Sequence, residues 1–277
     1  MVNRCAVLGK PVAHSLSPVI HTRAYELLGI ADAWHYGRHE VDEAGLGAFI
    51  AGRGPEWVGL SCTAPLKREL LRHGEPSARA LLLDAGNTFL FGRDGAPPRV
   101  ENTDVTGLLG ALAREGVTSA STALLLGNGA TARSALLALA ELGVREVLVC
   151  ARSAERAHAG LDDLAARLGL SLDVARWGEV PDAAASDVLV ATVSEPLRPE
   201  VAAGLVAMTR ACFDATYNHY PTELDRAARA AGIVALSGLD LLVGQALDQI
   251  ELMTGRRCPS EPLLAAAHAA FAGGGIG

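Results

Sequence analysis

The chain has 277 residues, enough for one large or two modest domains, and it carries a formal net charge of -7 with 4% aromatic residues. Because a chain without a basic excess and with few aromatic rings offers little to nucleic acid, this composition favours a small-molecule partner. The five cysteines are odd in number, widely spread and without a C-x-x-C pair, which argues against a disulfide framework and a structural zinc site.

The N-terminal part of the chain reads as an α/β unit. A short strand, Cys5–Gly9, follows Met1 without the apolar stretch of a signal peptide, and no later segment is apolar for long enough to span a bilayer, so we expect a cytoplasmic protein. Ser17 and Pro18 read as the N-cap and first residue of a helix to Leu28, closed by Gly29. Later elements are strands at Ala33–Val41 and Trp57–Ser61, a helix at Glu43–Gly52 between them, and a hairpin of Asn87–Phe91 and Arg99–Asn102 across Asp94-Gly95.

From Val105 a helix leads into a second series of strands and helices. Short apolar runs alternate here with alanine- and leucine-rich stretches, which predicts an α/β fold with mainly parallel strands. The strand candidates are Thr122–Leu126, Val147–Cys150, Asp187–Ala191, Ala211–Ala215 and Ile233–Leu236. Two helices follow from Gly238 without starting another unit, so we expect them to pack on the first domain.

A glycine-rich pattern follows the strand at Thr122–Leu126. Gly127-Asn128-Gly129-Ala130-Thr131-Ala132 fits G-x-G-x-x-G/A and precedes a helix expected at Arg133–Leu142. In this context it predicts a dinucleotide site, because the glycines allow a tight turn and a close backbone approach to a pyrophosphate, with the helix N-terminus facing the phosphates. The alternative is a glycine-rich turn without a ligand.

The tip of the next strand carries cations where NAD-binding sites hold an acid. It reads Cys150-Ala151-Arg152-Ser153-Ala154-Glu155-Arg156. Two guanidiniums and a hydroxyl favour the 2′-phosphate of NADP through bidentate contacts, although Glu155 between them opposes this charge. The alternative is that Arg152 and Arg156 are solvated at the start of a helix.

Lysine occurs only at Lys10 and Lys67 among 24 basic residues. An ammonium, unlike a guanidinium, can lose its proton when partly desolvated, so Lys67, after the small residues of Ser61–Ala64, is a candidate proton donor. If Asp104 faces Lys67, its carboxylate would orient the ammonium and the two would titrate as a pair. A solvated lysine and a helix cap are the respective alternatives.

Hydroxyl and amide side chains cluster at predicted strand ends. Ser15 and Ser17 lie between a strand and a helix, where open α/β sheets bind ligands, and their hydroxyls suit a carboxylate. Asn87-Thr88 and Asn102-Thr103 add groups suited to a polyhydroxylated ring. A simple N-cap at Ser17 is the alternative.

These motifs resemble, in order and over essentially the whole chain, those of the shikimate dehydrogenase family. They are G-x-P-x-x-H-S-x-S-P at Gly9–Pro18 with His21 after it, T-x-P-x-K at Thr63–Lys67, Asn-Thr elements at Asn87 and Asn102, D-x-x-Y-N at Asp214–Asn218, and G-x-x-x-L-x-x-Q-A at Gly238–Ala246.

The resemblance implies an NADP-dependent oxidoreductase that reversibly reduces 3-dehydroshikimate to shikimate, on the route to chorismate and the aromatic amino acids. Lys67 and Asp104 would form the catalytic pair. The resemblance assigns the substrate carboxylate to Ser15, Ser17 and Tyr217, and the ring hydroxyls to Thr63, Asn87, Asn102 and Gln245.

The implied fold has two domains with a cleft between them in which catalysis occurs. A discontinuous α/β substrate domain would comprise residues 1–104 and 238–277, and a Rossmann-type parallel-sheet NADP domain residues 105–237. We expect a monomer or homodimer without nucleic-acid or membrane partners.

The chain departs from the family pattern at several positions. Ser61 stands where asparagine is usual, so recognition of ring hydroxyls could shift, and Ala151-Arg152-Ser153 replaces an N-R-T element. The later cofactor loop, Ala191–Pro196, lacks the usual asparagine and Gly-Met, and the element at Gly238 lacks a methionine. We nevertheless expect Thr192, Val193 and Gly238 at the cofactor and Ser61 at the ring.

Two alternatives follow from these departures. A paralogue acting on quinate or an amino-substituted analogue would use the same catalytic pair, and Ser61 keeps it open. A non-catalytic NADP-binding sensor is disfavoured by the presence of both Lys67 and Asp104.

Overall fold

The computed structural model describes residues 2–176, 185–217 and 219–273. The chain divides into two compact units, one formed by the segment up to Thr103 together with the segment from Leu242 on, and the other by Asp104–Leu241. The structure thus assigns Asp104 and residues 238–241 to the second unit, whereas the sequence had grouped them with the first. Asn218 of the D-x-x-Y-N pattern lies outside the described residues.

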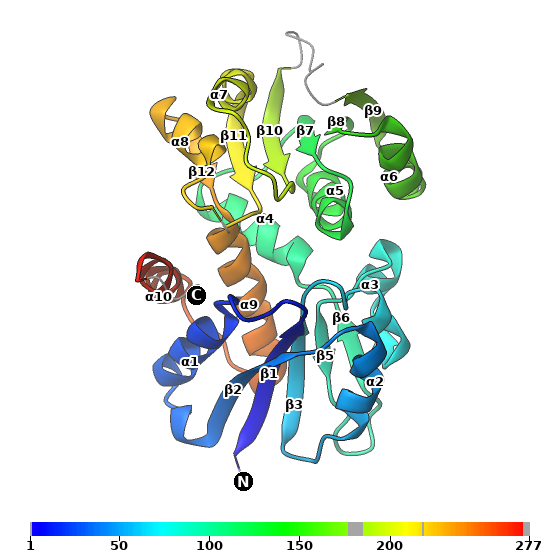
Figure 1. Cartoon of the computed structure of the whole chain (residues 1–277), viewed down its shortest axis with the longest axis vertical. Helices are drawn as coiled ribbons and strands as arrows, with labels where there is room; N and C mark the ends of the chain where they lie inside the picture. The colour runs from blue at the N-terminus through cyan, green and yellow to red at the C-terminus, as the bar shows by residue number, and fades with distance from the viewer. Residues whose placement is uncertain (1, 177–184, 218, 274–277) are drawn as a thin grey trace. The chain divides into compact units, whose positions relative to one another are not determined.

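The first unit is built on a mixed six-stranded sheet with the order β2-β1-β3-β5-β6-β4 (Figure 1). Its strands are β1 (Asn3–Gly9), β2 (Trp34–Glu40), β3 (Trp57–Cys62), β4 (Glu75–Pro76), β5 (Thr88–Leu90) and β6 (Arg99–Glu101). β1 runs parallel to β2 and β3, while β5 runs antiparallel to both β3 and β6. The predicted hairpin is therefore confirmed, and Asp94 and Gly95 in its turn have φ of 53° and 83°.

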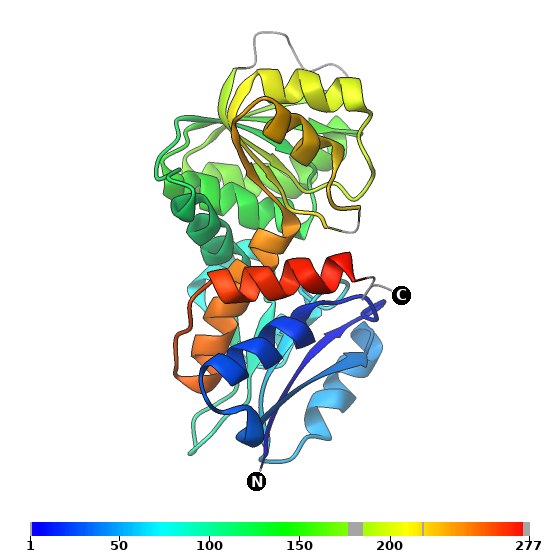
Figure 2. The same ribbon diagram turned by 90° about the vertical axis from the view of Figure 1, so that its left-hand side faces the viewer.

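Helices cover both faces of this sheet. They are α1 (Ser17–Leu27), α2 (Glu43–Ala51), α3 (Ala78–Leu83), α10 (Glu261–Ala272) and the greater part of α9 (Gly238–Thr254), with single 3-10 turns η1 (Ala31–Ala33) and η2 (Glu69–Arg72). Successive side chains of β1 point to opposite faces, so Cys5 and Val7 join one apolar cluster and Ala6 and Leu8 another. Figure 2 shows α1 and α10 side by side on one face, with α2 on the other.

The start of α1 differs from the sequence prediction. Leu16 is the N-cap and Ser17 is the first helical residue. The Oγ of Ser15 accepts a hydrogen bond from the backbone N–H of Ser17 at 3.3 Å. The N-cap interpretation of Ser17 is therefore wrong, because the hydroxyl that serves the first turn belongs to the serine two residues earlier.

The second unit is a six-stranded parallel sheet with the order β12-β11-β10-β7-β8-β9. Its strands are β7 (Thr122–Leu126), β8 (Glu146–Ala151), β9 (Ser171–Arg176), β10 (Ser186–Ala191), β11 (Thr209–Asp214) and β12 (Val234–Leu236). The strand order reverses between β7 and β10, and at such a reversal doubly wound sheets bind ligands at the carboxyl ends of their strands. The predicted α/β fold with a parallel-sheet Rossmann-type unit is confirmed.

Five helices accompany the sheet of the second unit in the described part of the chain, besides the first turn of α9. They are α4 (Asp104–Arg114), α5 (Ala130–Leu142), α6 (Ala154–Leu168), α7 (Pro199–Ala207) and α8 (Glu223–Ala230). α5 packs beside α6 and α7 beside α8, and Figures 1 and 2 show the two pairs on opposite faces of the sheet. Since both faces are covered, β7 is a continuous apolar run with Ala123–Leu126 buried.

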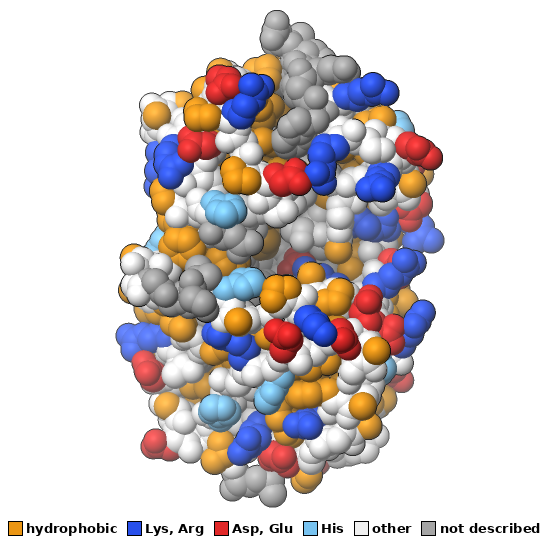
Figure 3. All heavy atoms as spheres, in the orientation of Figure 1, with side chains coloured by type: hydrophobic (Ala, Val, Ile, Leu, Met, Phe, Trp, Pro, Cys, Tyr) orange, Lys and Arg blue, Asp and Glu red, His pale blue; other side chains and the backbone are white. Residues whose placement is uncertain are grey.

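Charged side chains of both signs are interspersed on the face of the molecule drawn in Figure 3. Across the described ranges, none of the helices combines the length and the apolar character needed to cross a bilayer.

Candidate active site

The register of the strands brings the candidate substrate-binding side chains of the first unit together at one end of β3, β5 and β6. Ser61 near the end of β3 pairs with Thr88 at the start of β5, and Thr88 pairs in turn with Glu101 at the end of β6. Asn87 and Asn102 flank these positions. Three segments that are distant in the sequence therefore meet at the carboxyl end of β3.

The loops after β1 and β3 lie side by side at this edge. The backbone N–H of Lys10 donates to the carbonyl of Ala64 at 3.1 Å, and that of Thr63 donates to the carbonyl of Leu8 at 2.9 Å. A Cβ added at Gly9 would lie 2.4 Å from the Cγ2 of Thr63, so only glycine permits this approach. The loop carrying Ser15 is thereby held next to the segment carrying Thr63 and Lys67.

A serine pair precedes and opens α1. Ser15 and Ser17 are 8% and 3% exposed, and their hydroxyl oxygens lie 3.2 Å apart. The guanidinium of Arg38 donates to the backbone carbonyls of Ala13 and of Ser15, the latter at 2.7 Å. These bonds fix the loop and leave the two hydroxyls adjacent, which suits an anionic oxygen.

Asn87 is the centre of a buried polar cluster. Its Oδ1 accepts hydrogen bonds from the backbone N–H of Thr103 and the hydroxyl of Thr88, both at 2.9 Å, and its Nδ2 donates to the Oγ1 of Thr103 at 3.0 Å. Asn102 lies beside the cluster and donates from Nδ2 to the carbonyl of Ala85 at 3.0 Å. Each amide is thus held in one orientation by buried partners.

Ser61 belongs to a second buried chain of hydrogen bonds. The hydroxyl of Tyr36 donates to the Oγ of Ser61 at 2.5 Å, and Ser61 donates to the Oε1 of Gln249 at 2.6 Å. The Nε2 of Gln249 donates to the Oγ1 of Thr88 at 2.9 Å, which joins this chain to the cluster around Asn87. Ser61 is therefore linked by hydrogen bonds, through Gln249 and Thr88, to Asn87, which is predicted to bind the ring hydroxyls.

The sequence interpretation did not single out Tyr36 or Gln249. Gln249 follows Gln245 by one turn of α9, and this spacing is the one signal that could have suggested a shared face. Gln245 itself is 8% exposed and donates from Nε2 to the carbonyl of Leu242 at 2.9 Å.

His21 is fully buried against Tyr36. The two rings are stacked, with centroids 3.9 Å apart and an interplanar angle of 17°. Burial lowers the pKa of His21 to about 3, a shift that the side chain of Gln249 opposes in part. The imidazole is therefore neutral near pH 7, and its role is to pack against the ring of Tyr36, whose hydroxyl starts the chain of hydrogen bonds through Ser61.

Lys67 and Asp104 fall in different units. Lys67 follows β3 in the first unit, where its carbonyl accepts a hydrogen bond from the N–H of Gly86 at 2.8 Å, next to Asn87. Asp104 is the first residue of α4 in the second unit and is 6% exposed. The helix start predicted at this position is confirmed, and the pairing of the two side chains stays a prediction.

The glycine-rich loop of the second unit lines a cavity of about 360 Å³. Its walls come from the carboxyl ends of β7, β8 and β10, the three strands at the reversal of strand order. The lining residues are Gly127, Asn128, Gly129, Ala151, Arg152, Ser153, Arg156, Thr192, Val193, Ser194 and Glu195. Most of the residues that the sequence assigned to the cofactor are therefore brought together.

The two glycines of the loop have different surroundings. Gly127 has a φ of +108°, and a Cβ there would lie 2.5 Å from the Oγ1 of Thr192. Gly129, the N-cap of α5, has open space where a Cβ would project. The loop thus leaves an uncovered backbone at the amino end of a helix, which fits a pyrophosphate.

Four predicted cofactor residues are not among those lining the cavity. Ala130, Thr131 and Ala132 form the first turn of α5, which begins three residues before the predicted Arg133. Gly238 packs elsewhere, because a Cβ on it would lie 2.5 Å from the carbonyl carbon of Thr216.

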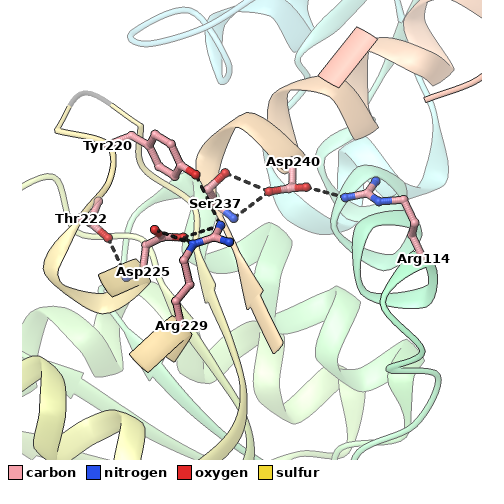
Figure 4. Close-up of polar contacts among 7 residues, drawn as sticks. All are labelled: Arg114, Tyr220, Thr222, Asp225, Arg229, Ser237 and Asp240. Atoms are coloured by element: carbon pink, nitrogen blue, oxygen red, sulfur yellow. Dashed lines mark hydrogen bonds and ion pairs between the residues drawn. The ribbon is translucent and has the colours of Figure 1, made fainter. Parts of the chain in front are cut away.

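The first turn of α9, which contains Gly238, is held by side chains of the second unit. Asp240 accepts from the backbone N–H of Ser237 at 2.9 Å and from its hydroxyl at 2.8 Å, and it pairs with Arg114 of α4 (Figure 4). In the same view Arg229 forms two bonds to Asp225, at 3.0 and 2.9 Å. The start of α9 therefore provides a fixed surface for the Thr216 backbone.

Tyr217 follows a short turn at the end of β11. The carboxylate of Asp214 accepts hydrogen bonds from the N–H and the hydroxyl of Thr216, at 3.1 and 2.9 Å. Burial raises the pKa of Asp214, while its hydrogen bonds to Thr222 and Thr216 oppose this shift. Asp214 thus orders the chain that leads into Tyr217.

Arg152 at the tip of β8 has an acidic partner. Its Nη1 lies 2.7 Å from the Oε1 of Glu195, which follows β10. Ser153 caps α6 by accepting from the N–H of Arg156 at 3.3 Å. The sequence interpretation named Glu155 as the opposing charge, whereas the carboxylate that pairs with Arg152 is that of Glu195.

Comparisons with known proteins agree with this geometry. Residues 7–89 match the family model of the shikimate dehydrogenase substrate binding domain. The chain is 35% identical over 275 residues to the NADP-dependent shikimate dehydrogenase of Methanothrix thermoacetophila, covering 96% of this chain and 97% of that protein.

Solved structures with the same fold give the same result. A shikimate dehydrogenase crystal structure from Mycobacterium tuberculosis is 40% identical and has a TM-score of 0.84, covering 96% of this chain and 99% of that one. A Thermus thermophilus shikimate 5-dehydrogenase, solved in complex with NADP(H) and shikimate, is 31% identical with a TM-score of 0.81, covering 98% and 100%.

Proposed function

The chain belongs to the shikimate dehydrogenase family, and from this membership we propose that it catalyses the reversible NADPH-dependent reduction of 3-dehydroshikimate to shikimate. It is an oxidoreductase acting on a CH–OH group with NADP as cofactor, in the formation of chorismate and the aromatic amino acids. The observation that carries the proposal is the register of β3, β5 and β6, which gathers hydroxyl and amide side chains beside the Lys67 segment.

Substrate binding is assigned mainly to polar groups of the first unit. We assign the substrate carboxylate to the adjacent hydroxyls of Ser15 and Ser17, with Tyr217 as a further ligand. The ring hydroxyls are assigned to Thr63, Asn87, Asn102 and Gln245, with Ser61 behind them. Because Asn87 is held by several buried hydrogen bonds, it binds without reorganisation.

The acid–base role is assigned to Lys67 and Asp104. NADPH, when bound, supplies the hydride that reduces the carbonyl carbon. Lys67 gives its Nζ proton to the oxygen that gains negative charge, and in the reverse direction takes it back. Asp104 is assigned the role of orienting the ammonium.

The cofactor is assigned to the cavity at the glycine-rich loop. Gly127, Asn128 and Gly129 offer backbone to the pyrophosphate, with Ala130, Thr131 and Ala132 in the helical turn that follows. Arg152, Arg156 and Ser153 are assigned to the 2′-phosphate, and Ala151, Thr192 and Val193 to the walls. Gly238 contributes by placing the Thr216 backbone.

The quinate or amino-analogue alternative rested on Ser61. In the structure the Ser61 hydroxyl is bonded to both Tyr36 and Gln249, so its presence in place of asparagine gives that alternative no separate support. A cytoplasmic location and a monomeric or homodimeric state remain our expectations. The five cysteines, none of them paired, are consistent with a reducing compartment.

The test is an absorbance assay at the nicotinamide band. The full chain is incubated with shikimate or quinate and with NADP+ or NAD+, and the four initial rates are compared. We expect the highest kcat/KM for shikimate with NADP+. A higher value for quinate, or no cofactor reduction with either acid, contradicts the proposal.

A further inference from the structure

The ion pair between Arg152 and Glu195 forms part of the lining of the cofactor cavity. Both side chains line the cavity, and their charged atoms are 2.7 Å apart. Arg152 follows β8 and Glu195 follows β10, while β7 with its glycine-rich loop lies between these strands. The pair therefore bridges the two walls over the end of β7.

The loop that carries Glu195 is tied to β7 by its backbone, whereas the side chain of Glu195 is largely exposed. The N–H and the hydroxyl of Thr192 both bond to the carbonyl of Leu126, at 2.8 and 2.9 Å, which ties the loop to β7. The side chains of Arg152 and Glu195 are 75% and 64% exposed. An exposed pair of this kind is weak and exchanges readily with another anion.

We propose that Glu195 is a specificity-determining residue that competes with the 2′-phosphate of NADP for the guanidinium of Arg152. The inference rests on the proposed assignment of the 2′-phosphate to Arg152. When the phosphate takes the guanidinium, it displaces Glu195 and leaves a carboxylate close to a dianion. NAD lacks this phosphate, so Glu195 narrows the preference for NADP that Arg152 provides.

The opposite role for Glu195 is physically reasonable and gives an opposite result. A carboxylate can hold a guanidinium in the orientation in which it binds phosphate, and its removal would then weaken NADP binding. Removal of the Glu195 carboxylate should therefore strengthen NADP binding if Glu195 competes with the phosphate, and weaken it if Glu195 orients Arg152.

The experiment is Glu195→Gln in the full chain, with the Kd of NADP+ and of NAD+ measured by titration calorimetry at low salt. We expect NADP+ to bind about two- to fivefold more tightly, the upper part of the range of an exposed ion pair, and NAD+ to change less than about twofold. The gain should shrink at high salt. An unchanged or weaker affinity for NADP+ overturns the inference.

Glu200→Gln is the matched control. Glu200 pairs with Arg198 at 3.0 Å, and its side chain is 64% exposed, the same fraction as that of Glu195. Unlike Arg152 and Glu195, however, Arg198 and Glu200 do not line the cavity. We expect this variant to bind both dinucleotides as the unmodified chain does. An equal gain in NADP+ affinity in Glu200→Gln would show a general charge effect and would overturn the inference.

Arg152→Ala separates this inference from its premise. If this variant loses affinity for NADP+ and NAD+ equally, the 2′-phosphate assignment itself is wrong. If it loses NADP+ selectively, the premise stands, and adding Glu195→Gln to it should alter the NADP+ affinity less than about twofold. If Glu195→Gln raised the NADP+ affinity as much in the Arg152→Ala background as in the unmodified chain, Glu195 would act by direct repulsion of the phosphate and not by competition for Arg152.

Discussion

The Oγ of Ser61 donates a hydrogen bond to the Oε1 of Gln249 at 2.6 Å, across 188 positions of the chain. This contact joins the third strand of the first unit to the helix that returns from the other end of the sequence. With its Oε1 bonded to Ser61, the side chain of Gln249 directs its Nε2 to the Oγ1 of Thr88 at 2.9 Å.

Replacement of Ser61 by alanine should destabilise the first unit. The hydroxyl of Tyr36 and the Oε1 of Gln249 would each lose a buried partner, which costs about 1–3 kcal/mol of unfolding free energy. Urea unfolding measures the loss, with the exposed Ser119→Ala as control. Equal stability of the two variants would show that the chain of bonds contributes nothing.

Lys67→Met should reduce kcat by roughly 10²–10⁴-fold, because the variant lacks the proton that the substrate oxygen needs. Its Kd for NADP+ should stay within about twofold, since Lys67 belongs to the first unit and the cofactor cavity is formed by the second. Lys10→Met, which alters the only other lysine, is the control. A Lys67→Met enzyme with most of its turnover would remove this residue from the mechanism.

The two loop glycines should respond differently to alanine. Gly127→Ala forces a Cβ to 2.5 Å from Thr192 at a positive φ, so we expect a stability loss of at least about 1–2 kcal/mol. Gly129→Ala meets no protein atom within 4 Å. Its melting temperature should therefore be unchanged while NADP+ binding weakens. Retained affinity in Gly129→Ala would mean that the pyrophosphate does not approach this backbone.

Stability should fall on mild acidification because of His21. Its pKa is about 3 in the folded chain against 6.5 in the unfolded chain, so the unfolded state binds more protons between these values. The contribution is fully present above pH 6.5, and about 2 kcal/mol is lost by pH 5. Burial and Arg53 also lower the pKa of His39, which acts in the same direction.

Urea unfolding at pH 7.5 and at pH 5 measures this loss in the unmodified chain and in His21→Phe. The phenyl ring keeps the stack on Tyr36 but cannot titrate. We expect a clearly smaller loss in His21→Phe, and the unmodified loss in the exposed control His219→Gln. The same loss in all three proteins would exclude His21 as the cause.

The sequence predicted those features that depend on local patterns. The strand at Thr122–Leu126 and the glycines after it have a periodicity and a composition that few other structures share. The motif residues after β1 and β3 could be grouped because parallel strands present their carboxyl ends on the same side of a sheet, whereas Asn87 and Thr88 join them from the start of the antiparallel β5. Element boundaries were less certain, since Gly129 and Leu16 act as N-caps without a side-chain signal.

What remained hidden depends on tertiary contacts. β9 was missed because it is a half-exposed edge strand whose residues lack a continuous apolar run. Tyr36 and Gln249 are ordinary residues until the fold places Ser61 between them. The pairing of Arg152 with Glu195 likewise depends on the order of β8, β7 and β10 in the sheet.

The interrupted first unit has a consequence for synthesis on the ribosome. Residues 104–241 form one contiguous unit and can fold as soon as they emerge, whereas the strands before Thr103 must wait for the helices after Leu242. Until then Ser61 and Thr88 lack the amide of Gln249 that completes their bonds. Nascent chains that stall late should therefore carry a finished second unit and an incomplete first unit, which would expose them to chaperones and proteases.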